Sequence, residues 1–330
     1  MTRVLRIAAA QMGPVNSGEP QTETVGRLLA LIDQAADKGC DIAVFPELAL
    51  STFFPRSYLL NISDADGFYE HIMPSADVQP LFDHAKRRRI GFSLGYAEIA
   101  NEGENTHRYN TQILVDRDGR IVSKYRKVHL PGHTDHRPDD PFQNLEKYYF
   151  EVGNLGFPVV DAFGGRIGMC ICNDRRWPET YRMMGLQGVE LITLGYTTPI
   201  YNPRAKQSPE LRMFQSRLCM QAGAYQNSTF VVGVAKAGKE DGVDLMGGSC
   251  IIHPDGRVIA ETTGLDDEIA FADCDLDDCV NGKMEEFNFE RNRRPELYDG
   301  LLTPHESIPS PADILKASRL GQPIGEEASS

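Results

Sequence analysis

The segment Asp41-Ile42-Ala43-Val44-Phe45-Pro46-Glu47 is typical of a short buried strand that ends at a proline and a carboxylate. Before it, residues 24–38 carry apolar side chains at helical spacing, and residues 6–11 form another short apolar strand. After it, a predicted helix over 78–89 leads into a predicted strand over 90–99. Strands that alternate with helices in this way predict an α/β fold.

The rest of the chain adds hairpins to this pattern. Asp118-Gly119 and Asp255-Gly256 mark tight turns between β-rich runs. The predicted hairpins cover residues 111–124 and 248–259, and a further β pair covers 157–172. Strands are predicted over 190–197 and 229–235, and helices over 209–224 and from Pro178. The sequence therefore predicts mixed sheets covered by helices.

The domain organisation follows from the distribution of these signals. No linker-like stretch divides the chain before about residue 300, so we expect one compact domain over residues 1–302. Pro, Ser and Glu accumulate after it and periodicity fades. We expect residues 303–330 to form a tail that is mobile or wraps around a partner interface.

Composition excludes several classes of function. The net charge of −13, from 34 basic and 47 acidic residues, argues against nucleic-acid binding. No apolar run approaches the length of a membrane span, and the amino terminus lacks the pattern of a signal peptide. Seven cysteines, an odd number, fit free thiols better than a disulfide framework. We therefore expect a cytoplasmic protein with no membrane partner.

Cys172 is the strongest candidate for a nucleophile. An apolar strand ends at this residue, and a polar turn leads from it to the helix that begins at Pro178. A nucleophile is well held at such a strand end, near a helix amino terminus that favours negative charge. The alternative is an ordinary buried cysteine. The pattern Cys170-x-Cys172 also suggests a metal, but no cluster with ligand spacing accompanies it, so we expect no metal site.

Partners for this thiol come from other strand ends. Glu47 could act as a general base, although a salt-bridging glutamate is the ordinary alternative. Lys127 could stabilise an oxyanion, although a lysine in a basic run is usually solvated. His129 and His133 are rival partners without a local signature. Spacing alone does not bring any of these residues together.

Three segments give the chain a specific resemblance. Phe45-Pro46-Glu47-Leu48, Tyr125-Arg126-Lys127-Val128-His129-Leu130-Pro131 and Cys172-Asn173-Asp174-Arg175-Arg176-Trp177-Pro178-Glu179 resemble the three signatures of the nitrilase superfamily, in order and in spacing. The residues after Cys172 are most similar to those of the N-carbamoyl-D-amino acid amidohydrolases, or D-carbamoylases. The likeness covers roughly residues 4 to 300.

The resemblance implies a four-layer α-β-β-α sandwich and assembly as a homodimer or homotetramer. Glu47, Lys127 and Cys172 would form the catalytic triad, with Glu146 as a further glutamate near the lysine. The enzyme would need no cofactor. Its substrate would be a small carboxylated ureido or amide compound, which is hydrolysed through a thioester-type intermediate to the D-amino acid, carbon dioxide and ammonia.

The resemblance also implies the substrate-binding residues. These are Asn173, Arg175, Arg176 and Thr198, and a guanidinium suits the carboxylate of an N-carbamoyl amino acid. The alternative is that Asp174 or Glu179 pairs with the arginines. Two departures concern the substrate: Thr197 stands where D-carbamoylases usually have Asn, and Asn144 replaces a family histidine. A related amidase acting on another carboxylated amide or ureido acid is therefore the alternative function. A non-catalytic scaffold is a weaker one.

Overall fold

The computed structural model describes residues 3–140, 142–202, 207–304 and 307–320. The chain forms two compact units, Met1–Phe287 and Asn288–Ser330. The predicted boundary after residue 302 stays a prediction, and part of the expected tail (305–306 and 321–330) lies outside the described residues.

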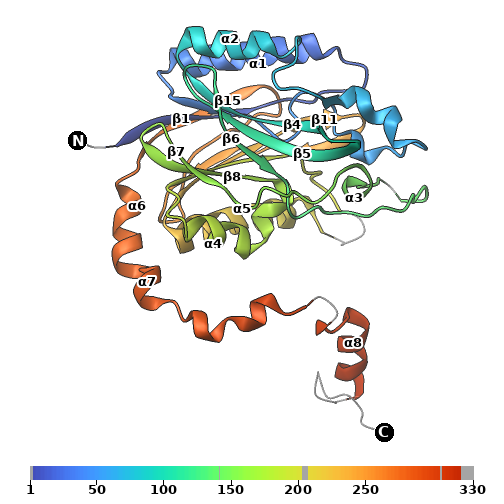
Figure 1. The fold of residues 1–330 in the computed structure, drawn as a ribbon, viewed down its shortest axis with the longest axis vertical. Coiled ribbons are helices and arrows are strands. Elements are labelled where there is room, and N and C mark those ends of the chain that lie inside the picture. Colours follow the sequence, from blue (N-terminus) through green and yellow to red (C-terminus); the bar gives the residue numbers. More distant parts are fainter. Residues whose placement is uncertain (1–2, 141, 203–206, 305–306, 321–330) are drawn as a thin grey trace. The chain divides into compact units, whose positions relative to one another are not determined.

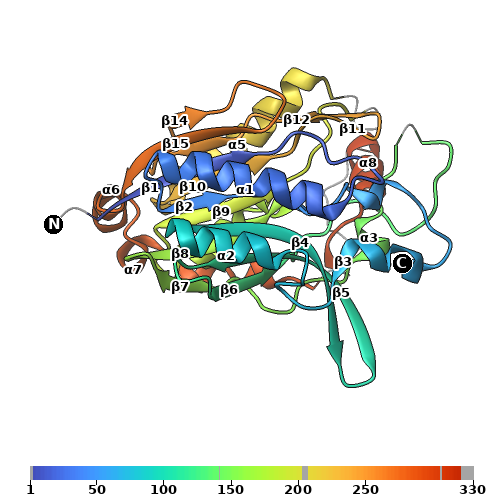
Figure 2. The same cartoon turned by 90° about the horizontal axis from the view of Figure 1, so that it is seen from above.

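The first sheet of the larger unit combines parallel and antiparallel strands. Its order is β15-β1-β2-β4-β5-β6, and the short β3 pairs with β4. The strands are β1 (Val4–Gln11), β2 (Ile42–Val44), β3 (Tyr69–Glu70), β4 (Gly91–Glu102), β5 (Asn105–Val115), β6 (Ile121–Arg126) and β15 (Glu268–Asp275). The pairs β1–β2 and β2–β4 are parallel, as expected for strands joined through helices. The β4–β5 hairpin projects from the sheet (Figure 2).

The second sheet is built in a similar way. Its order is β14-β13-β10-β9-β8-β7, with a parallel centre formed by β8, β9 and β10. The strands are β7 (Val159–Ala162), β8 (Gly165–Ile171), β9 (Leu191–Tyr196), β10 (Phe230–Ala235), β13 (Cys250–Ile252) and β14 (Val258–Glu261). A separate hairpin pairs β11 (Ala237–Glu240) with β12 (Val243–Met246).

Helices form the two outer layers. Helices α1 (Gln21–Asp37) and α2 (Gln79–Arg88) cover the first sheet, and α4 (Pro178–Gly185) and α5 (Pro209–Asn227) cover the second (Figure 1). Shorter helices are the 3-10 helices Phe54–Arg56, Ile62–Phe68 and Cys172–Arg176, with α3 (Glu146–Tyr149), α6 (Asp278–Asn281) and the π-helix Gly282–Glu286. This is the predicted four-layer α-β-β-α sandwich.

The alternation of side chains along a strand explains these layers. In β1, Ile7 and Ala9 belong to the core that joins the two sheets, whereas Ala8 and Ala10 belong to the core beneath α1 and α2. Successive strand residues point to opposite faces, so a strand covered on both sides must be apolar throughout. The continuous apolar run at residues 6–11 has this cause.

The smaller unit consists of short helices. They are α7 (Phe289–Asn292), the 3-10 helices Pro295–Leu297 and Asp299–Leu302, and α8 (Pro311–Leu320). Helix α8 is not among the helices predicted from the sequence. Local chemistry explains it, because Ser310 and Asp313 cap its first turn through mutual hydrogen bonds, with Pro311 as the first helical residue.

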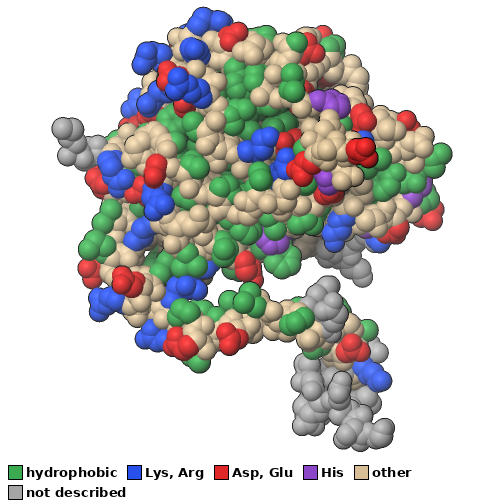
Figure 3. All heavy atoms as spheres, in the orientation of Figure 1, with side chains coloured by type: hydrophobic (Ala, Val, Ile, Leu, Met, Phe, Trp, Pro, Cys, Tyr) green, Lys and Arg blue, Asp and Glu red, His purple; other side chains and the backbone are tan. Residues whose placement is uncertain are grey.

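Three further properties bear on the chain as a whole. Among the described residues, no helix is long and apolar enough to cross a membrane. On the face shown in Figure 3, basic side chains are interspersed with acidic ones. All seven cysteines are free, and six of them are buried.

Candidate active site

Three strands of the sandwich deliver the predicted reactive residues. Glu47 follows β2, Lys127 follows β6 and Cys172 follows β8. Cys172 has a φ of 48°, in the left-handed region that non-glycine residues rarely adopt. Backbone strain of this kind costs roughly 1–3 kcal/mol and is concentrated at functional sites. The turn therefore sets the direction of the Cys172 side chain.

Lys127 joins two buried carboxylates. Its Nζ lies 2.6 Å from Oε1 of Glu47 and also donates to Oε2 of Glu146. All three side chains are buried. Asn110 donates to the same oxygen of Glu47 at 2.8 Å, and the backbone N–H of Thr197 donates to Oε2 at 2.8 Å. The Glu47 carboxylate is thus held from both sides.

Burial and charge set the protonation of this cluster. Burial lowers the pKa of Lys127, but the charges of Glu146 and Glu47 outweigh it and raise that pKa above its usual value. Burial is also the main cause that raises the pKa of Glu146 to about 7, against the opposing charge of Lys127. The lysine is therefore a permanent cation.

The thiol of Cys172 is buried and protonated at neutral pH. Cys172 is 7% exposed, and burial, followed by the charge of Glu47, raises the pKa of its thiol, although Lys127 and Arg175 act in the opposite direction. A buried thiolate lacks solvation by water, and this loss outweighs the nearby cations. The resting cysteine is therefore a neutral thiol.

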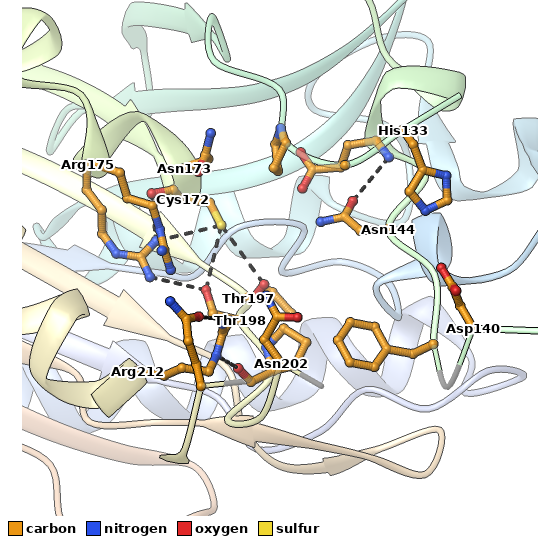
Figure 4. Close-up of a pocket in the computed structure, with 17 residues that line it drawn as sticks. His133, Asp140, Asn144, Cys172, Asn173, Arg175, Thr197, Thr198, Asn202 and Arg212 are labelled. Atoms are coloured by element: carbon orange, nitrogen blue, oxygen red, sulfur yellow. Dashed lines mark hydrogen bonds between the residues drawn. The ribbon is translucent and has the colours of Figure 1, made fainter. Parts of the chain in front are cut away.

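Thr197 connects the thiol with the carboxylate. The sulfur lies 4.0 Å from the carbonyl oxygen of Thr197 and 3.8 Å from Oγ1 of Thr198 (Figure 4). The N–H of the same Thr197 binds Glu47. Cys172 and Glu47 therefore flank one residue at the end of β9.

Two glycines make room for Glu47 between the sheets. A Cβ added to Gly195 on β9 would lie 2.5 Å from the backbone nitrogen of Glu47. A Cβ added to Gly95 on β4 would lie 2.8 Å from its Cα. Both distances are shorter than real Cβ contacts, so any side chain at these positions would displace the segment that carries the carboxylate.

Asp174 links the turn after Cys172 to the segment that carries Lys127. Its carboxylate accepts hydrogen bonds from the Ile171 N–H at 3.0 Å and the Tyr125 hydroxyl at 2.8 Å. It also binds the backbone N–H of His129 at 2.9 Å and the ring Nδ1 at 2.8 Å. His129, one of the rival partners of the thiol, is therefore engaged elsewhere. The other rival, His133, lines the cavity and binds the carbonyl of Asp135.

The two predicted arginines have different surroundings. Arg175 is buried, and its nitrogens bond the Cys172 carbonyl at 2.6 Å, Ser216 Oγ at 3.2 Å and Thr198 Oγ1 at 3.2 Å. Arg176 is half-buried and has no partner among the described residues. Neither arginine has a described ion pair with Asp174 or Glu179.

A cavity of about 570 Å³ opens at the sulfur. Its wall contains all four predicted substrate-binding residues, Asn173, Arg175, Arg176 and Thr198, together with Cys172 and Glu146. Figure 4 shows most of these side chains around the opening. Glu47 and Lys127 are joined to this wall through Thr197 and Glu146. The side chain of Asn173 also donates to the carbonyl of His129 at 3.1 Å.

Sequence reasoning misses four residues of this site: Asn110, Asp174 as an acceptor, Thr197 as a link, and Arg212. The last has a detectable signal. Arg212, Ser216 and Met220 follow one another at four-residue spacing on the buried face of α5. A charged residue on an otherwise buried helix face indicates a polar site.

Comparison with known proteins defines the family. The family model for carbon-nitrogen hydrolases matches residues 6–283. N-carbamoylputrescine amidase of Arabidopsis thaliana is 30% identical over 83% of this chain and 88% of the relative. Citrullinase of Francisella tularensis is 28% identical over 90% of this chain and 98% of the relative.

A solved structure supports the same fold. The crystal structure of a carbon-nitrogen hydrolase from Helicobacter pylori superimposes with a TM-score of 0.77 and 21% identity, over 92% of this chain and 99% of that one. These matches confirm the resemblance to the nitrilase superfamily. With its sandwich fold and a family match over most of its length, the chain belongs to the carbon-nitrogen hydrolase family.

Proposed function

We propose that this enzyme hydrolyses N-carbamoyl-D-amino acids to the D-amino acid, carbon dioxide and ammonia. The observation that carries the proposal is Arg176, a half-buried cation with no described partner, on the wall of the cavity that also holds Cys172. A cation at this place suits a substrate that joins a carboxylate to a ureido group. The preference for the D-enantiomer rests on the resemblance of residues 172–179 to D-carbamoylases.

The first half of the reaction uses the buried charges. Glu47 takes the thiol proton of Cys172 as the sulfur attacks the ureido carbonyl. Lys127 and the backbone N–H of Asn173 stabilise the oxyanion. The tetrahedral intermediate collapses with loss of ammonia, to which Glu47 returns the proton. The substrate is then bound to sulfur as a thiocarbamate.

The second half releases the product. Water, activated by Glu47, attacks the thiocarbamate carbon and expels the Cys172 sulfur. The N-carboxy amino acid that leaves the site loses carbon dioxide spontaneously. The neutral thiol supports this scheme, because proton removal is then a required step.

The two relatives reported above support a ureido substrate. The names of the two relatives specify N-carbamoylputrescine and citrulline, and both compounds carry a terminal ureido group. N-carbamoylputrescine is an amine and would be repelled by an arginine-lined cavity. The alternative is therefore an amidase for another carboxylated amide or ureido acid, in which the carboxylate lies farther from the scissile carbonyl. The replacement of an asparagine by Thr197 is the feature that favours it.

Ammonia release from matched D and L N-carbamoyl-phenylalanine tests the proposal. We expect ammonia from the D compound and at least about 1000-fold less from Cys172→Ala, with an unchanged circular dichroism spectrum. No ammonia from either enantiomer would favour the alternative substrate class. Substantial activity in folded Cys172→Ala would reject the nucleophile.

A further inference from the structure

Arg212 enters the same cavity from a different element. It lies in the first turn of α5 and is 6% exposed. Its Nε donates to the carbonyl of Pro199 at 2.9 Å and its Nη1 to Oε1 of Gln207 at 3.0 Å. Its Nη2 has no partner among the residues that the structure describes. Figure 4 places Arg212 beside the Thr197–Thr198 loop, on the side of the cavity where Arg175 lies.

Positive charge accumulates on this wall. Burial, and then the charges of Arg176 and Arg175, lower the pKa of Arg212 to about 10. In the described lining, the carboxylates are Glu146 and Asp140, and Glu146 is already paired with Lys127. Three guanidinium groups in a largely buried wall repel one another unless an anion lies between them.

The three arginines are not equivalent as ligands. Every nitrogen of Arg175 is bonded within the protein, and its guanidinium also lies 4.5 Å from the centre of the Tyr196 ring. Arg175 therefore positions Cys172 and Thr198. Arg176 and the Nη2 of Arg212 retain donors for a ligand. They come from separate elements, the turn after the nucleophile and the start of α5.

We propose that Arg212 is a specificity-determining residue that, together with Arg176, binds the carboxylate of the substrate. Two guanidinium groups on separate elements fix a carboxylate in position and in direction, which sets the distance from it to the carbonyl that Cys172 attacks. The contacts of Arg212 with Pro199 and Gln207 hold its fork in place before the substrate arrives. This inference rests on the proposed function and assigns the recognition of its carboxylate.

A pair of substrates separates recognition of the carboxylate from support of the loop. N-carbamoyl-D-phenylalanine carries the carboxylate, and 2-phenylethylurea has the same ureido group and ring without it. We expect Arg212→Gln to raise KM for the acid by about 10- to 100-fold and to leave KM for the urea largely unchanged. Arg176→Ala should show the same selectivity, and Arg212→Lys should give a smaller rise, because it keeps the charge without the fork.

Arg217→Gln is the matched control. Arg217 lies on the same helix and is paired with Glu261, outside the cavity lining. Its replacement should leave KM for both substrates unchanged. An equal loss on acid and urea in Arg212→Gln, or no change on either, would overturn the inference. If Arg212→Gln does not fold, Arg212→Lys serves instead, and an unchanged KM for the acid in Arg212→Lys would overturn the inference.

The test also distinguishes this inference from the proposed function. Wild-type protein that releases no ammonia from N-carbamoyl-D-phenylalanine rejects the proposed function and, with it, the inference. Wild-type protein that hydrolyses this acid, combined with an Arg212→Gln variant whose selectivity is unaltered, rejects the inference alone.

Discussion

Lys127 and Lys236 are both fully buried beside glutamates, but their clusters have opposite balances of charge. Around Lys127, two carboxylates share one ammonium group. Around Lys236, one carboxylate, that of Glu240, faces two cations, since Arg56 lies 2.9 Å from it on the other side. Only the cluster of Lys127 reaches the cavity wall, through Glu146.

The carboxylate oxygens show the same difference. Oε1 of Glu240 accepts from the Phe53 N–H at 2.8 Å and from Arg56, and Oε2 accepts from the Val15 N–H at 3.0 Å and from Lys236 at 3.1 Å. In Glu146, Oε1 has no partner among the described residues. A carboxylate whose two oxygens both have hydrogen-bond partners stabilises the fold. A carboxylate at a cavity with one oxygen left without a partner is available for chemistry.

The pKa values agree with this comparison. Burial raises the pKa of both glutamates. For Glu240 the charges of Lys236 and Arg56 outweigh burial and lower the pKa below its usual value. For Glu146 the charge of Lys127 does not outweigh the effect of burial, and the pKa rises to about 7. The two cations beside Glu240 therefore favour its ionised form, whereas Glu146 has one cation and the charge of Glu47 nearby.

The largest effect should come from Lys127→Met. It removes the proposed oxyanion donor and leaves two buried carboxylates unpaired, so kcat should fall at least about 1000-fold. The free energy of unfolding should fall by about 3–5 kcal/mol. Steady-state kinetics and urea denaturation measure both quantities. Lys236→Met is the comparison: if it lowers kcat as much as Lys127→Met does, the two clusters do not differ in function as inferred.

Glu240→Gln and Glu146→Gln should have opposite consequences. The first leaves two buried cations without their carboxylate and should lower the free energy of unfolding by about 3–5 kcal/mol. The second removes surplus negative charge, so its effect on stability should be smaller and its main effect should be on kcat. Urea denaturation of both variants at pH 7.5 tests this. Equal destabilisation would show that the charge balance does not govern stability here.

The smallest effect concerns pH. Glutamate has an ordinary pKa of 4.5, and Glu146 in the folded protein has a pKa of about 7. Between these values the folded protein holds a proton that the unfolded chain has released, so the contribution of Glu146 to stability falls as pH rises through this window. The free energy of unfolding of Glu146→Gln, measured relative to that of the wild type, should therefore be higher at pH 8 than at pH 5. Thermal unfolding at both pH values measures the difference, and a constant difference would contradict the raised pKa.

Much of the fold is predictable because its signals are local. The apolar strands, the hairpin of β5 and β6 and that of β13 and β14 all appear at the predicted places. The β11–β12 hairpin is missed although Asp241-Gly242 is a strong turn signal, with φ values of 47° and 83°. Strand β15 is harder to predict, since it pairs with β1 from the other end of the domain.

The site is predictable in a different way. Glu47 and Cys172 stand out because each follows an apolar strand, but only the family resemblance brings them together with Lys127. Asn110 and Thr197 bind Glu47 from sequence distances of 63 and 150 residues. Contacts of this kind depend on how the two sheets face each other, and the order of residues along the chain does not reveal that.

The protonated thiol of Cys172 has a consequence for the lifetime of the enzyme. Oxidants and alkylating agents react with the thiolate, and the protonated form is far less reactive. A cysteine that is 7% exposed and remains a thiol until a base takes its proton is protected between turnovers. Burial therefore also preserves the thiol that we propose as the nucleophile.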